Sequence, residues 1–154
     1  MPGLVSYASA DWEIHLPLDW TGKGDTGAGE QYFESGDGTK GIYIGSWRIP
    51  PVEGRTTQQW VESFRNAEQA SLLALGTYAW ELLVDETVCL GTTAMAWADA
   101  WARPQSYRIA SKVLLRVPLV VRAAFHDYLC DDLAASQSYF APLIESLRTP
   151  GTPH

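Results

Sequence analysis

The stretch that decides the fold runs from residue 94 to residue 101 and reads Ala-Met-Ala-Trp-Ala-Asp-Ala-Trp. Alanine occupies every second position, and larger side chains occupy the positions between. A repeat of two residues places alternate side chains on opposite faces of a β-strand, whereas a helix would scatter both sets around its circumference. The pattern therefore predicts a strand with one alanine face and a second face that carries Met95, Trp97, Asp99 and Trp101.

Three further strands are predicted around this one. Residues 107–116 and 121–129 alternate in the same way, and Pro104 and Pro118 mark the turns before each of them, because proline cannot donate to a strand ladder. Residues 78–84 are apolar almost throughout, which is typical of a strand that is covered on both faces. We therefore expect four consecutive antiparallel strands in this third of the chain.

The chain before these strands is predicted to add three more strands and one helix. The strands are expected at residues 12–16, 31–34 and 40–47, with a glycine-rich loop at 21–29 and an Asp-Gly hairpin turn within 35–39. Thr56 and Gln59 form a capping-box pattern, which predicts a helix that begins there and ends near Leu75. Its predicted core-facing residues are Trp60, Val61, Phe64 and Ala67, and its predicted outward residues are Glu62, Arg65 and Glu68.

A second helix is expected to close the chain. It is predicted to begin at Asp131 or Asp132, either of which can cap it, and its apolar stripe extends to Leu147. Pro142 lies inside the pattern and is a candidate for a kink. We expect residues 11–148 to form one domain, with a flexible arm at 1–10 and a disordered tail at 149–154.

Composition indicates a globular protein, with 46% apolar and 19% charged residues. The net charge of -7 argues against a nucleic-acid backbone or an anionic membrane as the main partner. Residues 1–10 lack the basic and apolar regions of a secretory signal, so we expect a cytoplasmic protein. Cys89 and Cys130 are expected to be buried free thiols, with a disulfide between them left open.

The order of predicted elements resembles the PsbP-like fold. The resemblance rests on this order together with the opening residues Leu16-Pro17-Leu18-Asp19-Trp20 and the closing residues Ser146-Leu147. The fold is shared by the photosystem subunit PsbP, the Mog-type Ran release factors and bacterial DcrB-type proteins. It implies an α+β sandwich with one seven-stranded, mostly antiparallel sheet and two main helices. The resemblance also places the last strand, near 120–129, beside the strand near 40–47, and it implies a binding or accessory protein without catalysis.

Catalytic and metal-binding patterns are weak in this sequence. The histidines are His15, His126 and His154, and they are scattered along the chain. His126 and Asp127 are adjacent in a predicted strand, so they point to opposite faces and cannot act together. The acidic pairs 85–86 and 131–132 suit a turn and a helix cap better than a metal site. We therefore expect no enzyme activity, no metal and no cofactor.

The second face of the 94–101 strand is the candidate binding site. A turn at 102–105 places Asp99 directly opposite Arg108, and Met95 directly opposite Lys112. The candidate site residues are Met95, Trp97, Asp99, Trp101, Arg108 and Lys112, with Arg122 and His126 joining them from the next strand if its register places them on this face. Aromatic residues, methionine and arginine are enriched at interfaces, so this face suits a protein or an acidic peptide as partner. The alternative is that a helix covers the tryptophans and that the long basic side chains lie over them.

Two functions follow from these observations. The first is a non-catalytic protein-binding module, as in an adaptor, a chaperone or an immunity-type partner of a bacterial secreted protein. The alternative is a small enzyme or small-molecule carrier with a pocket between sheet and helix. A deep cavity with His126 or paired carboxylates at its wall would favour the alternative, and a continuous dry core under both helices would favour the first.

Overall fold

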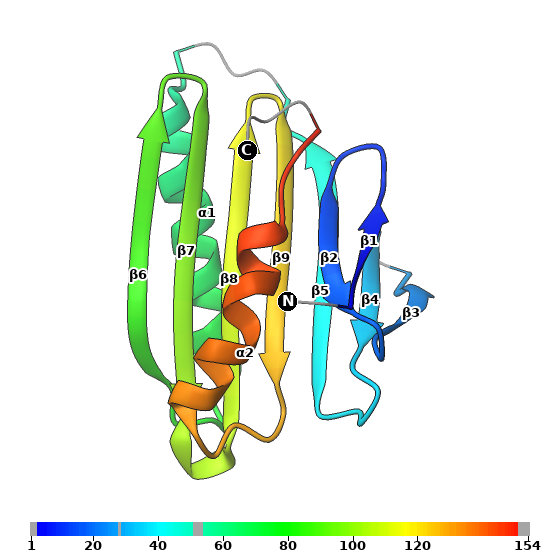
Figure 1. Ribbon diagram of the computed structural model, residues 1–154. Coiled ribbons are helices and arrows are strands. Elements are labelled where there is room, and N and C mark those ends of the chain that lie inside the picture. The colour runs from blue at the N-terminus through cyan, green and yellow to red at the C-terminus, as the bar shows by residue number, and fades with distance from the viewer. Residues whose placement is uncertain (1–2, 28, 51–53, 151–154) are drawn as a thin grey trace.

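The structure is a computed structural model, and it describes residues 3–27, 29–50 and 54–150 (Figure 1). Within these residues the chain forms nine strands and two α-helices. The elements are β1 (Leu4–Ala8), β2 (Glu13–Pro17), β3 (Thr21–Asp25), β4 (Glu30–Glu34), β5 (Lys40–Arg48), α1 (Thr57–Ala74), β6 (Glu81–Leu90), β7 (Thr93–Ala102), β8 (Tyr107–Arg116), β9 (Leu119–Asp127) and α2 (Leu133–Ser146).

The main sheet has seven strands in the order β3-β4-β5-β9-β8-β7-β6, and each neighbouring pair is antiparallel. The prediction that the last strand lies centrally beside the strand at 40–47 is confirmed, because β9 pairs with β5 along its whole length. The prediction that the strand near 78–84 is covered on both faces is wrong. It begins at Glu81, extends to Leu90 and lies at an edge of the sheet, where its apolar side chains are largely exposed.

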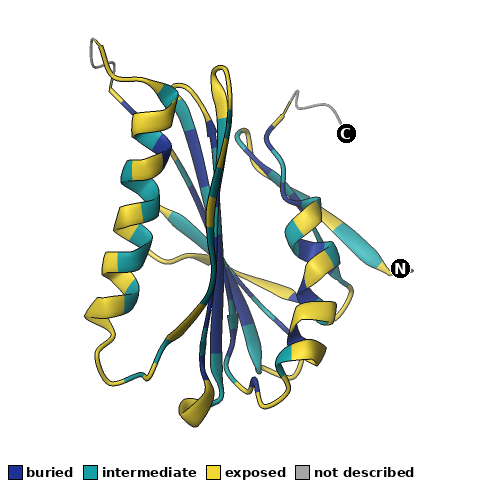
Figure 2. Cartoon of the chain, turned by 90° about the vertical axis from the view of Figure 1, so that its left-hand side faces the viewer, coloured by how far each residue is buried: buried dark blue, intermediate teal, exposed yellow. Residues whose placement is uncertain are grey.

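The molecule has three layers, with α1 on one face of the sheet and α2 on the other (Figure 2). The alanine row of β7 faces α1, and Ala96 packs with Val61 in a small core on that side. Alanine side chains are short, so they let a helix lie close to the sheet. The larger core lies on the other face, where Phe140 and Leu143 of α2 pack against Phe125 of β9.

Helix α1 begins as predicted, with a complete capping box between Thr56 and Gln59. The prediction that Arg65 and Glu68 face outward is wrong. Arg65 donates to Asp85 of β6 at 2.9 Å, and Glu68 accepts from Arg122 of β9. These charges turn toward the sheet because the sheet presents oppositely charged partners there.

The N-terminal region contains more regular structure than predicted. The predicted arm contains β1, which pairs with β2 as a separate two-stranded ribbon, and the predicted loop at 21–29 contains β3, which pairs with β4. Both predictions were wrong because the pairing depends on partner strands that local composition does not reveal. The ribbon also pairs with the chain after α2, through a bridge between Glu13 and Arg148. Of the predicted tail, Thr149 is buried, and residues 151–154 lie outside the described residues.

Helix α2 begins after Asp132, whose side chain accepts from the backbone N–H of Ala135, and it continues through Pro142 to Ser146. Cys89 and Cys130 are both free, with Cys130 buried and Cys89 partly buried.

Candidate functional site

Asp99 and Arg108 form a buried ion pair on the face of the sheet that α2 covers. Arg108 donates from Nε to Asp99 Oδ1 at 2.9 Å and from Nη2 to Oδ2 at 2.7 Å. Its third nitrogen, Nη1, donates to Ser136 Oγ of α2 at 3.1 Å. The prediction that the two residues share a face is confirmed. The two charges pair with each other inside the fold, so neither is free to bind a partner.

The predicted register of this hairpin is wrong by two positions, because Trp101 rather than Asp99 lies opposite Arg108. The chain turns through a short 3-10 helix at Arg103–Gln105, followed by Ser106 in the left-handed conformation. This turn begins one residue later than predicted and ends one residue later. An even shift keeps every side chain on its predicted face, so the ion pair forms diagonally across the ladder.

Lys112 is also used within the fold. Its Nζ donates to the carbonyl of Ile144 at 2.8 Å and to that of Leu147 at 3.4 Å, at the C-terminal end of α2. Burial lowers the pKa of the Lys112 ammonium group, and the charge of Glu145 opposes this effect. The last carbonyls of a helix lack partners within it and carry partial negative charge. Lys112 therefore anchors α2 and does not present a free charge to an acidic partner.

Arg122 and His126 lie on the opposite face of the sheet. They pair with Val113 and Ile109 of β8, whose side chains face α1. The prediction that Arg122 and His126 join Trp97 on one face is therefore wrong. The turn between β8 and β9 sets which side chains share a face, and this turn places Val121, Ala123 and Phe125 toward α2 instead.

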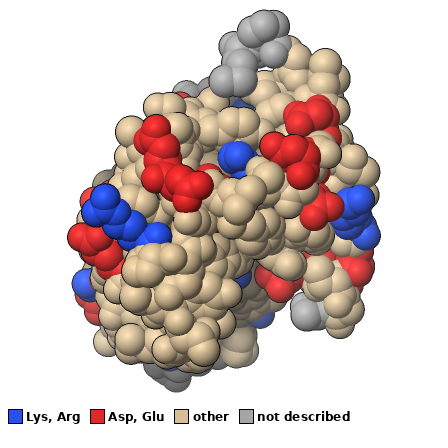
Figure 3. Space-filling view, turned by 90° about the horizontal axis from the view of Figure 1, so that it is seen from below, with Lys and Arg blue, Asp and Glu red and all other residues tan. Residues whose placement is uncertain are grey.

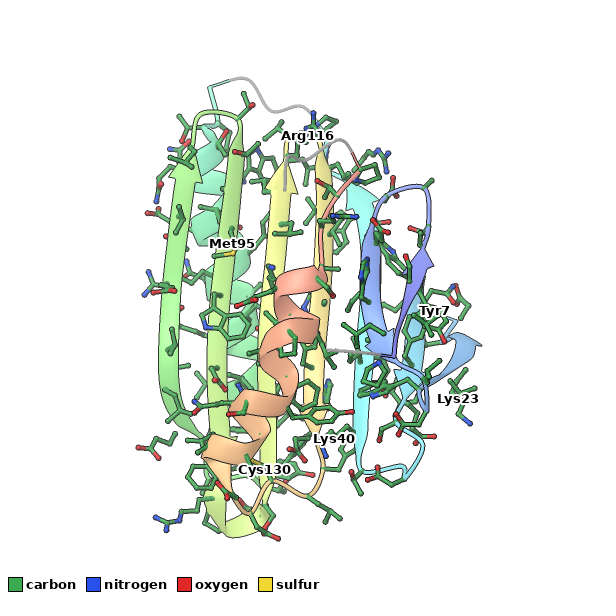
Figure 4. All side chains as sticks on the ribbon, in the orientation of Figure 1. Tyr7, Lys23, Lys40, Met95, Arg116 and Cys130 are labelled. Carbon is green, nitrogen blue, oxygen red and sulfur yellow. The ribbon has the colours of Figure 1, made fainter. Side chains whose placement is uncertain are left out.

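What remains open on the α2 side is an apolar strip along the edge of the sheet. We call it the β6–β7 strip; its residues are Val88, Leu90, Met95 and Trp97. Val88 and Leu90 are 47% and 74% exposed, while Met95 and Trp97 are partly buried. Figure 4 shows Met95 on β7, to the upper left of the C-terminal end of α2. Val88, Leu90 and Met95 line a shallow depression of about 250 Å³.

A second candidate site is the α1 pocket, a cavity of about 240 Å³ between α1 and the sheet. Its helix wall is formed by Glu68, Ser71, Leu72 and Leu75. Its sheet wall is formed by Glu30, Tyr43, Ala98, Ile109, Ser111, Arg122, Ala124 and His126. Small side chains at Ala98, Ser111 and Ala124 leave this volume unfilled beneath the helix.

The charged groups of the α1 pocket centre on Arg122. Its Nη2 donates to Glu68 Oε2 at 2.9 Å, its Nε donates to Glu68 Oε1, and its Nη1 lies 3.7 Å from Glu30 Oε2. Burial lowers the pKa of the Arg122 guanidinium, but the two carboxylates outweigh burial and the net shift is upward. Arg122 therefore stays charged and is shared between two glutamates.

His126 connects the α1 pocket to a cluster of tyrosines. Its ring centroid lies 5.2 Å from that of Tyr43 and 5.8 Å from those of Tyr107 and Tyr128, and its Nδ1 is hydrogen-bonded to the Tyr107 hydroxyl. Burial, assisted by the charge of Arg122, lowers the pKa of His126 to about 4. Burial also raises the pKa values of Tyr107 and Tyr128. The imidazole of His126 and the phenols of Tyr107 and Tyr128 are therefore neutral at pH 7.

The cluster is packed closely around Gly41. The Tyr32 and Tyr128 hydroxyls lie 3.3 Å apart. A Cβ atom added to Gly41 would lie 2.5 Å from the Tyr32 hydroxyl and 2.8 Å from that of Tyr128. Only glycine leaves room for both rings at this position.

Comparison with known proteins identifies the fold. No protein family and no curated protein sequence matches the chain. Among solved structures, cyanobacterial PsbP (CyanoP) from Synechocystis sp. PCC 6803 is similar with a TM-score of 0.67 and 14% identity, over 97% of this chain and 94% of that one. The chain has a PsbP-like fold.

A second solved structure also resembles this PsbP-like chain. It is a protein from Bacteroides thetaiotaomicron VPI-5482, with a TM-score of 0.55 and 15% identity, and the similarity covers 100% of this chain but 52% of the other. The PsbP-like chain therefore spans about half of that protein. At these identities the likeness is one of fold.

The sequence predicted some residues of the candidate sites in this PsbP-like chain and missed others. Sequence periodicity identified Trp97, Asp99 and Arg108 as sharing a face, but it did not identify Glu30, Glu68 or Tyr43 as part of a pocket. The one available signal was that Arg122, His126 and Tyr128 alternate in one strand. Among the residues that the structure describes, no group of three or more His, Cys, Asp or Glu is arranged to hold a metal ion, and no helix is long and apolar enough to cross a membrane.

Proposed function

We propose that this protein is a non-catalytic protein-binding module that captures an extended segment of its partner along strand β6. The observation that carries this proposal is the open edge of the sheet. β6 is ten residues long, and no strand in the described part of the chain pairs with its outer side. An unpaired edge presents backbone N–H and C=O groups that can accept an additional strand.

The side chains beside this edge supply the apolar part of the site. Val88 and Leu90 are exposed and alternate with residues that face α1, so they project on the same side as Met95 and Trp97. Aromatic residues and methionine are enriched in the core of protein interfaces. An added strand would place every second side chain over the β6–β7 strip.

The charges near β6 favour a basic partner segment. Glu81 and Glu86 are exposed and form no ion pair with any described residue. The basic groups expected for an acidic partner are occupied, because Arg108, Lys112 and Arg122 bind within the fold. We therefore replace the acidic peptide expected from the sequence with a segment that alternates apolar residues and carries Lys or Arg opposite Glu86.

A module that holds an extended segment suits an adaptor or chaperone. The PsbP-like resemblance implies binding and accessory roles, which supports this class. A partner secreted by bacteria, as expected from the sequence, would expose such a segment before it folds.

The test is selection of peptides from a random displayed library on the full chain, followed by amide hydrogen exchange with a selected peptide. We expect the selected peptides to alternate apolar residues with a nearby Lys or Arg, and to protect the backbone amides of residues 85–90. Leu90→Lys should weaken binding by about tenfold or more, because it replaces an apolar side chain of the β6–β7 strip with a charge that repels a Lys or Arg of the partner segment.

The matched control is Leu129→Lys, because Leu129 is also exposed, at 63%, but lies outside the β6–β7 strip. It should leave peptide binding unchanged. Protection at a different surface, or equal binding by the two variants, would overturn the proposal. A dimer of the chain that pairs β6 with β6 would also overturn it, because the occupant would then be a second copy.

The α1 pocket favours a second candidate function, a small-molecule carrier. The sequence-based alternative required a cavity with His126 or paired carboxylates at its wall, and the pocket has both in His126, Glu30 and Glu68. Thermal denaturation with a library of small metabolites tests this candidate, with Ser71→Trp as the variant that fills the pocket.

A further inference from the structure

We propose that the α1 pocket binds a small organic cation, such as a primary amine or a quaternary ammonium compound. This inference rests on the second candidate function, since it names the ligand class of the carrier site. It is carried by three properties of the pocket: an unbalanced negative charge, an aromatic wall and a volume that fits a small metabolite.

The charge of the wall is the first property. Among the residues that line the pocket, Glu30 and Glu68 carry negative charge and Arg122 carries positive charge, while His126 is neutral. One carboxylate therefore has no full counter-charge. Attraction between this charge and a ligand cation is stronger beneath the helix than in water, because the dielectric constant is lower there.

The geometry of Arg122 disfavours an anionic ligand. Each of its three guanidinium nitrogens already faces a carboxylate, with Nε and Nη2 on Glu68 and Nη1 toward Glu30. An anion would have to displace a glutamate to reach this group. Figure 3 shows acidic and basic side chains interspersed on the lower end of the molecule, without a continuous basic patch that would attract an anion there.

The aromatic wall suits a cation as well. Tyr43 lines the pocket, and its ring lies at 4.5 Å from Tyr32 and 5.2 Å from His126. The face of an aromatic ring carries partial negative charge and attracts ammonium groups. His126 lines the same wall, and only its Nδ1 is hydrogen-bonded to a described residue. In the tautomer whose Nδ1–H donates to the Tyr107 hydroxyl, the Nε2 atom can accept a hydrogen bond from an amine.

The volume limits the size of the ligand. About 240 Å³ corresponds to roughly eight water molecules at about 30 Å³ each. Drug-sized pockets are generally larger, from about 300 Å³ upward. A compact amine fits this space.

The test is calorimetric titration of the full chain with three probes of similar shape and different charge. The probes are choline, its uncharged analogue neohexanol and the anion of tert-butylacetic acid. We expect choline to bind about tenfold or more tightly than neohexanol, and the anion to bind least. Equal or tighter binding of either analogue would overturn the cation proposal while leaving the carrier function in place. Absence of binding by all three probes, together with no stabilisation by any metabolite in the library above, would overturn both.

Two charge-matched variants locate the site. Glu30→Gln removes a carboxylate from the pocket wall and should weaken choline binding severalfold. Glu62→Gln makes the same change on the exposed side of α1, outside the pocket, and should leave binding unchanged. Equal effects of the two variants would show that choline responds to overall charge, and this outcome would overturn the assignment to the pocket.

Discussion

Arg108 donates two hydrogen bonds to Asp99 beneath α2, although the two residues are not directly opposite in the ladder. The same guanidinium group reaches Ser136 of the helix. This contact links β7, β8 and α2 through one side chain.

The first prediction concerns this pair. Asp99→Ala should lower the free energy of unfolding by about 3–5 kcal/mol, because it leaves a buried guanidinium group without its counter-charge. Replacing both residues, as Asp99→Leu with Arg108→Met, should cost much less, since no charge then remains buried. Urea denaturation measures both. Asp11→Ala, which breaks the more exposed pair with Arg48, is the control and should cost about 1 kcal/mol or less.

The second prediction concerns the pH dependence of stability. Because the pKa of His126 falls to about 4 in the folded protein, the unfolded chain binds more protons between pH 6.5 and pH 4. Stability should therefore rise with pH across this window and be lost as pH falls, by roughly 2–3 kcal/mol in total. Arg122, Tyr43, Tyr107 and Tyr128 are the groups that surround the ring.

Urea midpoints at pH 7 and pH 5.5 measure this effect for the native chain and for His126→Phe. The phenyl ring cannot be protonated, so the difference between the two pH values should shrink in the variant. An unchanged difference would assign the pH dependence to other groups.

The third prediction separates packing from binding on the β6–β7 strip. Trp97 is partly buried and packs against the larger core, so Trp97→Ala should cost about 2 kcal/mol of stability. If Trp97 belonged only to an exposed binding face, the same change would leave the melting temperature nearly unaltered. Leu90→Lys should change stability by about 0.5 kcal/mol or less, because Leu90 is 74% exposed. Thermal denaturation of both variants decides this, and similar losses would contradict the exposure of Leu90.

The fourth prediction concerns Gly41. Gly41→Ala should destabilise the protein by about 1–3 kcal/mol, because the added methyl group overlaps the Tyr32 and Tyr128 hydroxyls. Adding Tyr32→Phe removes one of these oxygens and should recover part of the loss. Gly22→Ala is the matched control in another strand, where a Cβ lies 3.5 Å from the Phe33 ring and should be tolerated. Equal losses at both glycines in chemical denaturation would argue against the overlap.

Within the hairpin of β7 and β8, sequence periodicity predicted which side chains share a face better than it predicted the pairing register. The repeat of two assigned Asp99 and Arg108 to one face, and this assignment survived a register error of two positions. The register depends on the backbone conformation of the turn. Ser106 adopts a positive φ of 52° there, which the sequence does not predict. The face on which a side chain lies follows from the alternation of residues along its own strand. The pairing register also depends on the conformation of the turn, which this alternation does not predict.

Sequence periodicity did not predict the order of the strands in the sheet or the pocket beneath α1. The apolar residues near Val84 resemble a buried strand, but only the strand order shows that β6 lies at an edge. The α1 pocket arises where α1 crosses Ala98, Ser111 and Ala124, and these residues come from different strands. Their distance in sequence hides the cavity until the sheet is assembled.

The pairing of β5 with β9 has a consequence for the order of events during synthesis. β5 ends at Arg48 and its partner β9 begins at Leu119. Strands β3 to β5 therefore cannot pair with strands β6 to β9 until most of the chain has been synthesised. The hairpins from β6 to β9 connect neighbours in sequence and can form early, whereas closing the long connection is slow. We therefore expect β9 to act as the template on which the N-terminal strands dock, with an exposed strand edge on the nascent chain until they do.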